Sequence, residues 1–453
     1  MIVIDSEEIL TEKFRILGGE TLKGEVSVGG AKNSVLKLIA ATILVKGATK
    51  IYNVPHLTDV DIMLNVISDL GAHCTYDREE QSVIIDAHNI SSITAKYELV
   101  SKMRASFIIL GALMSRCKEA IVALPGGCAI GERRVDFHIK GLEALGAKIK
   151  IENGYVHAKA SKLVGTDIYL DIPSVGATEN LMLASVTAEG STRIQNAAQE
   201  PEIVDLANFL NTLGADIVGA GTSEIIINGV KLDSLHPAEY TTIPDRIEAG
   251  TFMAAIVATK GKAIINNVYP AHLTFFNDKL IKMGASIKLV EPTTIEVSCR
   301  NRLNSINFVT QPYPGFPTDL QAIAMTLLTT SNGVGIITES LYENRFMQVP
   351  DLRRMGADIH QDRNHAIVKG VKNLTGATVA ASDLRAGAAL VIAGLMANGE
   401  TIVEKLHHID RGYEDFEYKL ANLGAKIKRF DDVSFNGNSA DTASSIINIK
   451  GGV

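Results

Sequence analysis

A sixfold internal repeat constrains the fold of this chain more than any other feature. An apolar stretch ends in Leu-Gly-Ala or Met-Gly-Ala six times, and a β-rich or charged run follows each time. The repeat glycines are spaced by 75, 68, 70, 72 and 68 residues and are Gly71, Gly146, Gly214, Gly284, Gly356 and Gly424. Because a glycine just past a helix commonly takes the left-handed conformation that ends the helix, each motif predicts a helix end.

Each repeat also contains an earlier apolar helix, which a glycine or Asn-Gly closes in five cases before the next strand. The pattern predicts strand–helix–strand–strand–helix–strand over about 70 residues. Solenoid repeats run about 20–45 residues, so this period is too long for a typical solenoid. We therefore expect an α/β protein in which three repeats pack into each of two domains.

The first residues of the apolar helices form a second pattern. Lys32, Arg104, Arg246 and Arg385 occupy equivalent places, although the helix dipole favours negative side chains there. If these helix starts converge, the cations and the free backbone N–H groups would together bind an anion. The alternative is that each cation is a solvated surface residue.

A glycine-rich loop, LPGGCAIGERRVD, spans residues 124–136 and carries one cysteine. Cys128 lies five residues before Arg133, and Arg134 follows directly. Guanidinium groups close to a thiol lower its pKa, and such a thiol can act as an acid or as a nucleophile. The alternative is a small buried apolar residue. A Gly-Gly-Cys loop followed by charges favours the functional interpretation.

Composition and motif searches exclude several functions. The formal charge of −7 provides no general attraction for nucleic acid or anionic membrane. The four cysteines lack paired spacing, which argues against disulfides or a zinc site and for a reducing compartment. No signal peptide is visible, and the apolar stretch 386–397 is too short to span a bilayer. These features predict a soluble, cytoplasmic protein without partners among nucleic acids or membranes.

The remaining candidates point to one kind of chemistry. The dinucleotide fingerprint, the P-loop and the Gly-x-Ser-x-Gly motif are absent, and His407, His408 and Asp410 lack a partner motif that would favour a metal site. What remains is a set of arginines and lysines, one thiol, and the carboxylates in FPTD and PDRIE. Guanidinium forks suit phosphate and carboxylate, so we expect a small dianionic or trianionic substrate, an acidic thiol and a basic carboxylate.

A dense series of motifs closely resembles the UDP-N-acetylglucosamine 1-carboxyvinyltransferase family of enolpyruvyl transferases. The resemblance runs from about Leu17 to Arg429. The matching segments are GEVSVGGAKNS, KMRAS, LPGGCAIGERRVDFHI, PSVGATEN, AAQEPEIVDLANFL, IPDRIEAGTF, FPTDLQA, ITESLYENRFM, DLRAGAAL and HIDRGYE.

The resemblance implies a two-domain inside-out α/β barrel, with three βαββαβ repeats in each domain and the site in the cleft between them. It implies one domain of residues 33–243, which carries the Cys128 loop, and another of residues 1–32 plus 244–453. The Ser-, Asn- and Asp-rich tail, 430–453, reads as flexible. No metal or cofactor is implied, and a monomer is the default expectation.

The family transfers the enolpyruvyl group of phosphoenolpyruvate to the 3′-hydroxyl of the UDP-sugar and releases phosphate. Matching positions imply that Lys32 and Arg133 bind the phosphate and that Arg385 and Arg411 bind the carboxylate region. Cys128 would protonate the methylene carbon, and Asp319 would take the hydroxyl proton. Arg104 and Arg345 would help to close the cleft. The implied UDP-sugar contacts are Asn33, Arg133, Val135, Asp136, Ser174, Val175, Gly176, Thr318, Asp319 and Leu341. Arg134 stands where the family usually has proline.

Two alternatives stay open. The first is the sister transferase that acts on shikimate 3-phosphate, against which the cysteine loop and the Ser-Val-Gly-Ala-Thr segment argue. The second is a paralogue that binds the UDP-sugar without turnover. Joint retention of the implied site residues argues against it; these are Lys32, Cys128, Arg133, Asp319, Arg385 and Arg411, of which Lys32, Cys128, Asp319 and Arg411 are the implied catalytic residues.

The implied role of Cys128 is directly testable with fosfomycin, an epoxide that mimics phosphoenolpyruvate and alkylates the loop cysteine of this family. We expect fosfomycin to inactivate the wild-type protein and to add one covalent adduct at Cys128, measured by peptide mass spectrometry. Cys128→Asp removes the nucleophile and should resist. Equal sensitivity of the two proteins would show that Cys128 is wrongly assigned.

Overall fold

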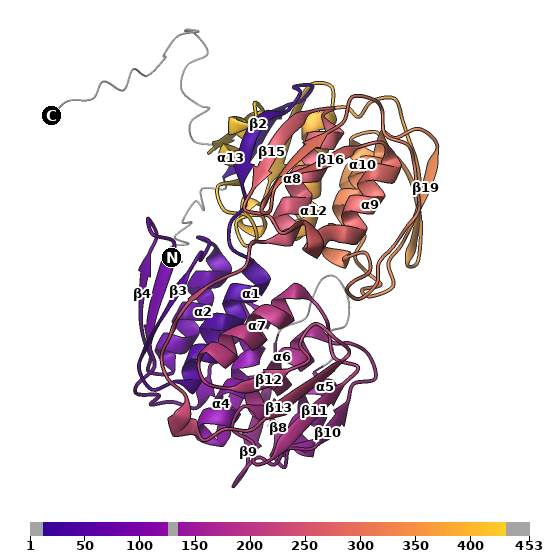
Figure 1. Cartoon of the computed structure of the whole chain (residues 1–453). Coiled ribbons are helices and arrows are strands. Elements are labelled where there is room, and N and C mark those ends of the chain that lie inside the picture. Colours follow the sequence, from indigo (N-terminus) through magenta and orange to yellow (C-terminus); the bar gives the residue numbers. More distant parts are fainter. Residues whose placement is uncertain (1–11, 126–134, 432–453) are drawn as a thin grey trace, which may run out of the picture.

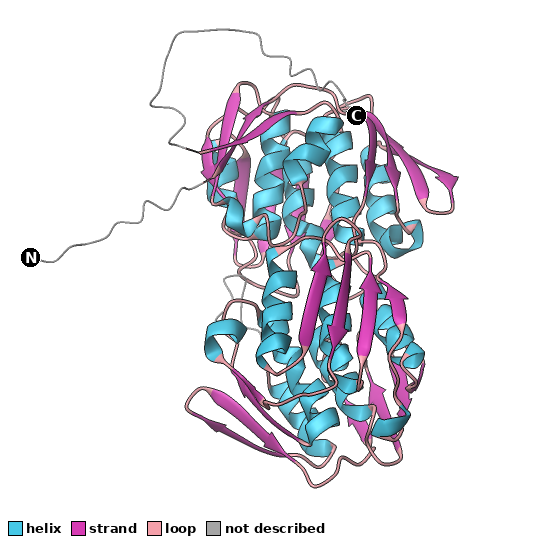
Figure 2. Cartoon of the chain, turned by 90° about the vertical axis from the view of Figure 1, so that its left-hand side faces the viewer, coloured by secondary structure: helices cyan, strands magenta, loops and turns pink. Residues whose placement is uncertain are grey.

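Six four-stranded sheets surround two groups of helices in the part of the chain that the structure, a computed structural model, describes. The described residues are 12–125 and 135–431. Cys128, Arg133 and Arg134 therefore lie outside them, as does the chain beyond residue 431. Figures 1 and 2 show two lobes stacked end to end, each with helices inside and strands on its outer faces.

Each repeat supplies most of one sheet, but three sheets take a strand from elsewhere in the chain. Strand β1 (Lys13–Leu17) joins the sheet of residues 378–430, β2 (Lys23–Ser27) joins that of residues 262–298, and β14 (Glu239–Thr241) joins that of residues 48–86.

The order of elements also differs from the expected βαββαβ. A single strand separates the two helices of a repeat, and the observed order is βαβαββ. The repeat around Gly214 consists of β10 (Asp167–Tyr169), α6 (Val175–Ser185), β11 (Ser191–Gln195), α7 (Pro201–Thr212), β12 (Asp216–Val218) and β13 (Glu224–Asn228). The first strand has only two or three residues in four of the repeats, too few for an alternating pattern to reveal it.

The six repeat glycines end helices as predicted. Their φ angles are all positive, from 91° to 112°. A left-handed residue after the helix lets the chain turn directly into the antiparallel strand pair. The helices that they close are α2 (Thr58–Asp69), α5 (Asp136–Ala144), α7, α9 (Thr274–Met283), α11 (Val349–Arg354) and α13 (Phe416–Asn422).

The chain passes between the two lobes in two adjacent segments. In one lobe β2 (Lys23–Ser27) pairs with β15 (Lys262–Asn266), and in the other β14 (Glu239–Thr241) pairs with β3 (Ala48–Tyr52). Between them, Gly30 forms an antiparallel bridge with Pro244. A Cβ at Gly30 would lie 1.8 Å from the carbonyl oxygen of Asn53, so this crossing requires glycine.

Each lobe has its own core, built around the first helix of each repeat. These inner helices are buried on nearly all sides and comprise α1 (Lys32–Ala41), α4 (Ile109–Cys117), α6, α8 (Arg246–Ala258), α10 (Gln321–Thr329) and α12 (Leu384–Met396). One core draws on residues 14–28 and 247–427, and the other on residues 35–235. No described helix is both long and apolar enough to cross a membrane.

Charged groups are buried among the inner helices of the lobe that contains α1 and α6. Glu179 is 1% exposed, and its Oε1 atom lies 3.3 Å from Nζ of Lys37. Burial raises the pKa of the Glu179 carboxyl to about 7, because the opposing charge of Lys37 does not fully offset the loss of hydration.

This raised pKa predicts a pH-dependent cost to stability. The folded chain retains a proton that the unfolded chain releases above about pH 4.5, so the contribution of Glu179 to stability falls as the pH rises towards 7. We expect Glu179→Gln to raise Tm relative to wild type, and to do so more at pH 8 than at pH 5. The corresponding gain in the free energy of unfolding should differ between the two pH values by up to about 3 kcal/mol.

Thermal unfolding at the two pH values measures the difference. Glu189→Gln, a substitution of an exposed carboxylate shortly after α6, provides the matched control and should show no such trend. A pH-independent difference between Glu179→Gln and wild type would contradict the prediction.

Candidate functional site

The starts of the inner helices hold most of the residues that the sequence singled out. Helix α1 begins at Lys32, and the side chain of Asp245 caps α8 by accepting from the amides of residues 247 and 248. Asp383 caps α12 in the same way, and Thr318 and Asp319 open the turn that leads into α10. The helix starts predicted at Lys32, Arg246 and Arg385 are therefore confirmed, whereas Arg104 opens a 3₁₀ turn five residues before α4.

Asp319 accepts hydrogen bonds from both lobes. Its Oδ1 atom lies 2.6 Å from Arg345 Nη2, and its Oδ2 atom lies 3.1 Å from Arg385 Nη2. Asn33, at the start of α1 in the other lobe, donates to Oδ2 at 3.4 Å. The side chains of Arg345 and Arg385 are only 6% and 2% exposed, whereas that of Asp319 is 25% exposed. Asp319 is thus the solvent-reachable member of a largely buried cluster.

The charge of Asp319 compensates the burial of these arginines. Burial lowers the pKa of the Arg345 guanidinium, but Asp319 and Asp383 outweigh that effect and raise it above its ordinary value. For Arg385, burial is outweighed by Tyr413, Asp319 and Asp245, so the pKa is also raised. Both groups stay charged, as phosphate or carboxylate binding requires.

Asp59 forms a second junction between the lobes, and sequence analysis missed it. Asp59 lies in the first turn of α2, and its side chain is 2% exposed. Its Oδ2 atom is 2.7 Å from Lys32 Nζ, and its Oδ1 atom accepts from Arg411 Nε at 2.8 Å. An acidic residue in a first helical turn is ordinary, so the sequence LTDVD carried no distinguishing signal.

The charges at this junction are closely coupled. Burial raises the pKa of the Asp59 carboxyl, but Lys32 and Arg411 together outweigh it, so the pKa lies below its usual value. Burial lowers the pKa of the Lys32 amine, and the nearby charges of Arg385 and Arg411 lower it further, against the opposing effect of Asp59. Lys32 and Arg385, predicted separately, therefore lie within electrostatic reach of each other.

Two of the predicted cations have other neighbours. Arg246 pairs with Glu202 on α7, with Nε 3.0 Å from Oε1, and its guanidinium lies 5.6 Å from the centre of the Tyr313 ring. The side chains of this ion pair are 10% and 4% exposed, so Arg246 joins the two lobes and is committed to Glu202. Arg104 begins a 3₁₀ turn and lies close enough to His138 to influence its pKa.

The helix ends of α5 and α6 bring together a second group of predicted residues. Val135 and Asp136 open α5, and the hydroxyl of Ser174 accepts from the amide of Ala177 at the start of α6. A Cβ at Gly176 would lie 3.4 Å from the imidazole of His138 on α5. The expected contacts Val135, Asp136 and Ser174–Gly176 therefore occupy neighbouring helix ends.

His138 and Asn180 form a buried polar pair behind these helix ends. The Asn180 amide donates to His138 Nδ1 at 2.8 Å, so the imidazole proton lies on Nε2, towards Gly176. Burial and the charge of Arg104 lower the pKa of His138 to about 3, and the ring stays neutral. The motif DFHI contained His138, but nothing in its spacing marked the residue.

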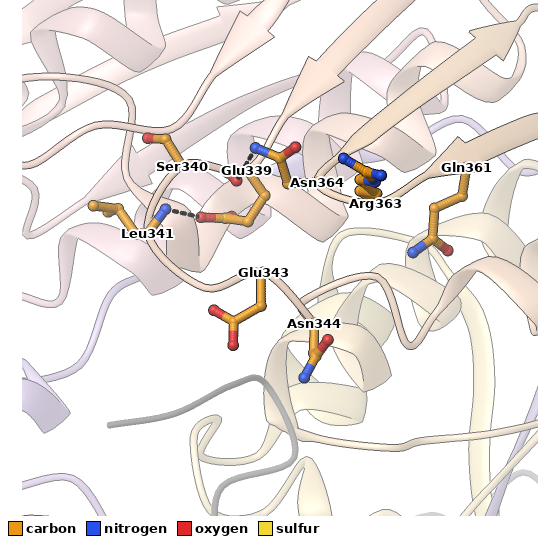
Figure 3. Close-up of a pocket in the computed structure, with 8 residues that line it drawn as sticks. All are labelled: Glu339, Ser340, Leu341, Glu343, Asn344, Gln361, Arg363 and Asn364. Atoms are coloured by element: carbon orange, nitrogen blue, oxygen red, sulfur yellow. Dashed lines mark hydrogen bonds between the residues drawn. The ribbon is translucent and has the colours of Figure 1, made fainter. Parts of the chain in front are cut away.

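Leu341 lies at the rim of a pocket of ≈ 520 Å³ whose lining residues Figure 3 shows. Its amide donates to the Glu339 carboxylate at 2.9 Å. Elsewhere, Asp410 pairs with Arg429, with Oδ1 2.6 Å from Nη2. The His407 and His408 rings lie with their centres 4.1 Å apart and their planes tilted by 42°. Within residues 12–125 and 135–431, no three His, Cys, Asp or Glu side chains form a group that could hold a metal ion.

Comparisons with known proteins agree with this architecture. A family model described as EPSP synthase (3-phosphoshikimate 1-carboxyvinyltransferase) matches residues 16–420. A Carboxydothermus hydrogenoformans protein named UDP-N-acetylglucosamine 1-carboxyvinyltransferase 2 is 53% identical over 422 residues, which cover 93% of this chain and 100% of that protein. A Gloeobacter violaceus protein named UDP-N-acetylglucosamine 1-carboxyvinyltransferase is 51% identical over 421 residues, or 93% of this chain and 91% of that protein.

Solved structures show the same fold. The enolpyruvyl transferase NikO from Streptomyces tendae matches with a TM-score of 0.84 and 26% identity over 93% of this chain and 99% of that chain. EPSP synthase from Acinetobacter baumannii matches with a TM-score of 0.69 and 18% identity over 93% of this chain and 100% of that chain. The expected two-domain inside-out α/β fold is confirmed.

The Asp59 junction predicts a linked change in charge and stability. Asp59→Asn removes the carboxylate that raises the pKa of Lys32, while the burial that lowers it remains. We expect the Lys32 pKa to fall further, measured by ¹⁵N NMR titration of the amine. Stability should drop by about 3 kcal/mol, because two cations lose their partner.

Asp61→Asn provides the matched control, since Asp61 lies on the same helix with a side chain that is 41% exposed. We expect Asp61→Asn to change neither the Lys32 pKa nor Tm appreciably. An unchanged Lys32 pKa in Asp59→Asn would contradict the coupling between these groups.

Proposed function

Because this chain belongs to the EPSP synthase family of enolpyruvyl transferases, we propose that it transfers the enolpyruvyl group of phosphoenolpyruvate to the 3′-hydroxyl of UDP-N-acetylglucosamine. The relatives that carry this activity in their names are about 50% identical over nearly their whole length. The observation that carries the proposal is the convergence of Lys32, Arg345, Arg385 and Arg411 around two carboxylates where the lobes meet.

The charges at this junction suit the proposed donor. Phosphoenolpyruvate carries a phosphate and a carboxylate, and a site for it needs several cations within the length of one small molecule. We propose that Lys32, with Arg133 from the loop outside the described residues, binds the phosphate. Arg385 and Arg411 would bind the carboxylate, so that substrate oxygens take over hydrogen bonds now made to Asp319 and Asp59.

The chemistry then needs an acid and a base at opposite ends of the donor. Cys128 would add a proton to C3 of phosphoenolpyruvate, which makes C2 electrophilic, while the sugar hydroxyl attacks C2 and gives its proton to Asp319. The product keeps the C=CH₂ group, so C3 must then lose a proton as the C2–O bond to phosphate breaks. Positioned cations around the departing phosphate would stabilise the charge that develops there.

We propose that the acceptor sugar nucleotide lies between the start of α1 and the ends of α5 and α6. Asn33, Val135, Asp136, Ser174, Val175 and Gly176 would contact it on one side, and Thr318, Asp319 and Leu341 on the other. Arg104 and Arg345 would help to close the site. The reaction would be the first committed step of peptidoglycan precursor synthesis, in the cytoplasm, and would support cell-wall growth and division. Fosfomycin would act as its inhibitor through Cys128.

Phosphate release from phosphoenolpyruvate tests this proposal against its alternatives. We expect release that depends on UDP-N-acetylglucosamine and does not occur with shikimate 3-phosphate or without an acceptor. Release with shikimate 3-phosphate alone would indicate the sister activity. Binding of the UDP-sugar by calorimetry without any release would indicate a non-catalytic protein, and either result would contradict the proposed function.

A further inference from the structure

A buried carboxylate that the proposed mechanism does not use lies directly behind Asp319. Glu339 follows β19 (Val334–Thr338) and is 1% exposed. Its backbone is held by Asn364, whose carbonyl accepts from the Glu339 amide at 2.8 Å and whose side-chain amide donates to the Glu339 carbonyl at 3.2 Å. Figure 3 shows Glu339 at the edge of the pocket, beside Leu341 and Asn364. A buried carboxylate needs an explanation, because leaving water is costly unless partners compensate it.

The two oxygens of Glu339 serve different segments. Oε1 accepts from the Thr310 hydroxyl at 2.7 Å and from the amides of Leu341 and Tyr342 at 2.9 and 3.1 Å. Oε2 accepts from the Thr318 hydroxyl at 2.8 Å. The first oxygen therefore holds the turn after β19, and the second oxygen holds the residue that precedes Asp319.

The bond to Thr318 sets the direction of a hydrogen-bond relay. A hydroxyl has one proton, and when Thr318 gives it to Glu339, the oxygen lone pairs remain to accept from another donor. Arg345 Nη1 donates to Thr318 Oγ1 at 3.0 Å, while Arg345 Nη2 donates to Asp319 Oδ1 at 2.6 Å. The guanidinium group of Arg345 thus bonds both Thr318 and Asp319. Because Glu339 holds the Thr318 hydroxyl, it also bears on the orientation of that guanidinium group.

We propose that Glu339 is a positioning residue for the reaction. Through Thr318 and Arg345 it fixes the carboxylate of Asp319, so that one oxygen is held by Arg345 and the other points towards Asn33 and Arg385. This inference rests on the proposed function, in which Asp319 takes the proton of the acceptor hydroxyl. A base that acts on a single hydroxyl must be held within hydrogen-bond reach of it.

Three substitutions separate the two sets of bonds that Glu339 makes. One set is the relay through Thr318 to Arg345, and the other is the set of bonds from Oε1 that holds the turn after β19. Glu339→Gln keeps the shape, but three donors converge on Oε1, so the amide oxygen must stay there and the NH₂ group must face Thr318. Thr318→Val breaks the relay at its middle and leaves the turn bonds intact. Thr310→Val removes one bond to Oε1 without touching the relay, and it is the matched control.

We expect Glu339→Gln and Thr318→Val each to lower kcat about 10- to 100-fold. This is less than most of the roughly 10²- to 10⁴-fold that general acid–base catalysis contributes, because Asp319 itself remains in place. The KM for phosphoenolpyruvate should change little. The acidic limb of the kcat/KM profile should move to higher pH, because a loosely held Arg345 stabilises the charged form of Asp319 less. The double variant should be no slower than the slower single variant, since both substitutions cut the same path. Thr310→Val should stay within about twofold of wild-type kcat, even if its Tm falls.

A ¹³C NMR titration of the Asp319 carboxyl gives a readout that does not depend on turnover. Its midpoint should rise in Glu339→Gln and Thr318→Val and stay unchanged in Thr310→Val. If wild type releases no phosphate but the midpoint shifts as expected, the proposed function fails, and what stands is the coupling of Glu339 to Asp319 without a role in that reaction. If wild type turns over but both relay variants match it in kcat and in midpoint, the positioning role is wrong. Should Glu339→Gln fail to fold, the same two measurements on Thr318→Val decide the matter.

Discussion

Two carboxylates, the buried Asp59 and the partly exposed Asp319, allow four cations to meet where the lobes join. Unit charges about 4 Å apart interact by about 4 kcal/mol at an effective dielectric constant of 20, so uncompensated like charges there would strongly oppose closure. Asp59 compensates Lys32 and Arg411, and Asp319 compensates Arg345 and Arg385. The cations that would bind an anionic substrate can therefore lie close together before the substrate arrives, because the two carboxylates offset their mutual repulsion.

The inner helices explain why these charges lie at helix starts. In a helix enclosed on all sides by its own lobe, the only backbone N–H and C=O groups without partners inside the helix lie at its two ends. The free N–H groups lie at the N-terminal end. Asp245 and Asp383 satisfy such groups on α8 and α12 with their side chains. The same ends carry Lys32, Asp319 and Arg385, so the repeat itself brings these charged groups of both lobes together.

Much of this could be predicted, because repeats and helix ends are local features of a sequence. The six glycines predicted six helix ends. The cations at equivalent positions predicted an anion site on the condition that the helix starts converge, and those of Lys32 and Arg385 do. The strand order was wrong because strands as short as β6 (Thr94–Ala95) leave no periodic pattern. Asp59 and Glu339 were missed for a different reason. Asp59 depends on Arg411, which is 352 residues away, and no local pattern carries such a contact. Glu339 depends on Thr310 and Thr318, which are 29 and 21 residues away on other segments, and its spacing to them matches no helix or strand period.

The contacts between the lobes are notably polar, and this bears on how substrates enter. The two cores share no residue in the part of the chain that the structure describes. The lobes are joined instead by ion pairs such as Arg411–Asp59 and Arg246–Glu202. The Glu414 carboxylate also accepts hydrogen bonds from the backbone amide of His56 and the side-chain amide of Gln81. Separating apolar surfaces would cost about 25 cal/mol per Å², whereas separated ion pairs regain hydration that offsets their lost attraction. Parting the lobes would therefore cost less than separating apolar surfaces of the same size, and a bound anion that replaces the hydrogen bonds of Asp59 and Asp319 would favour the closed arrangement.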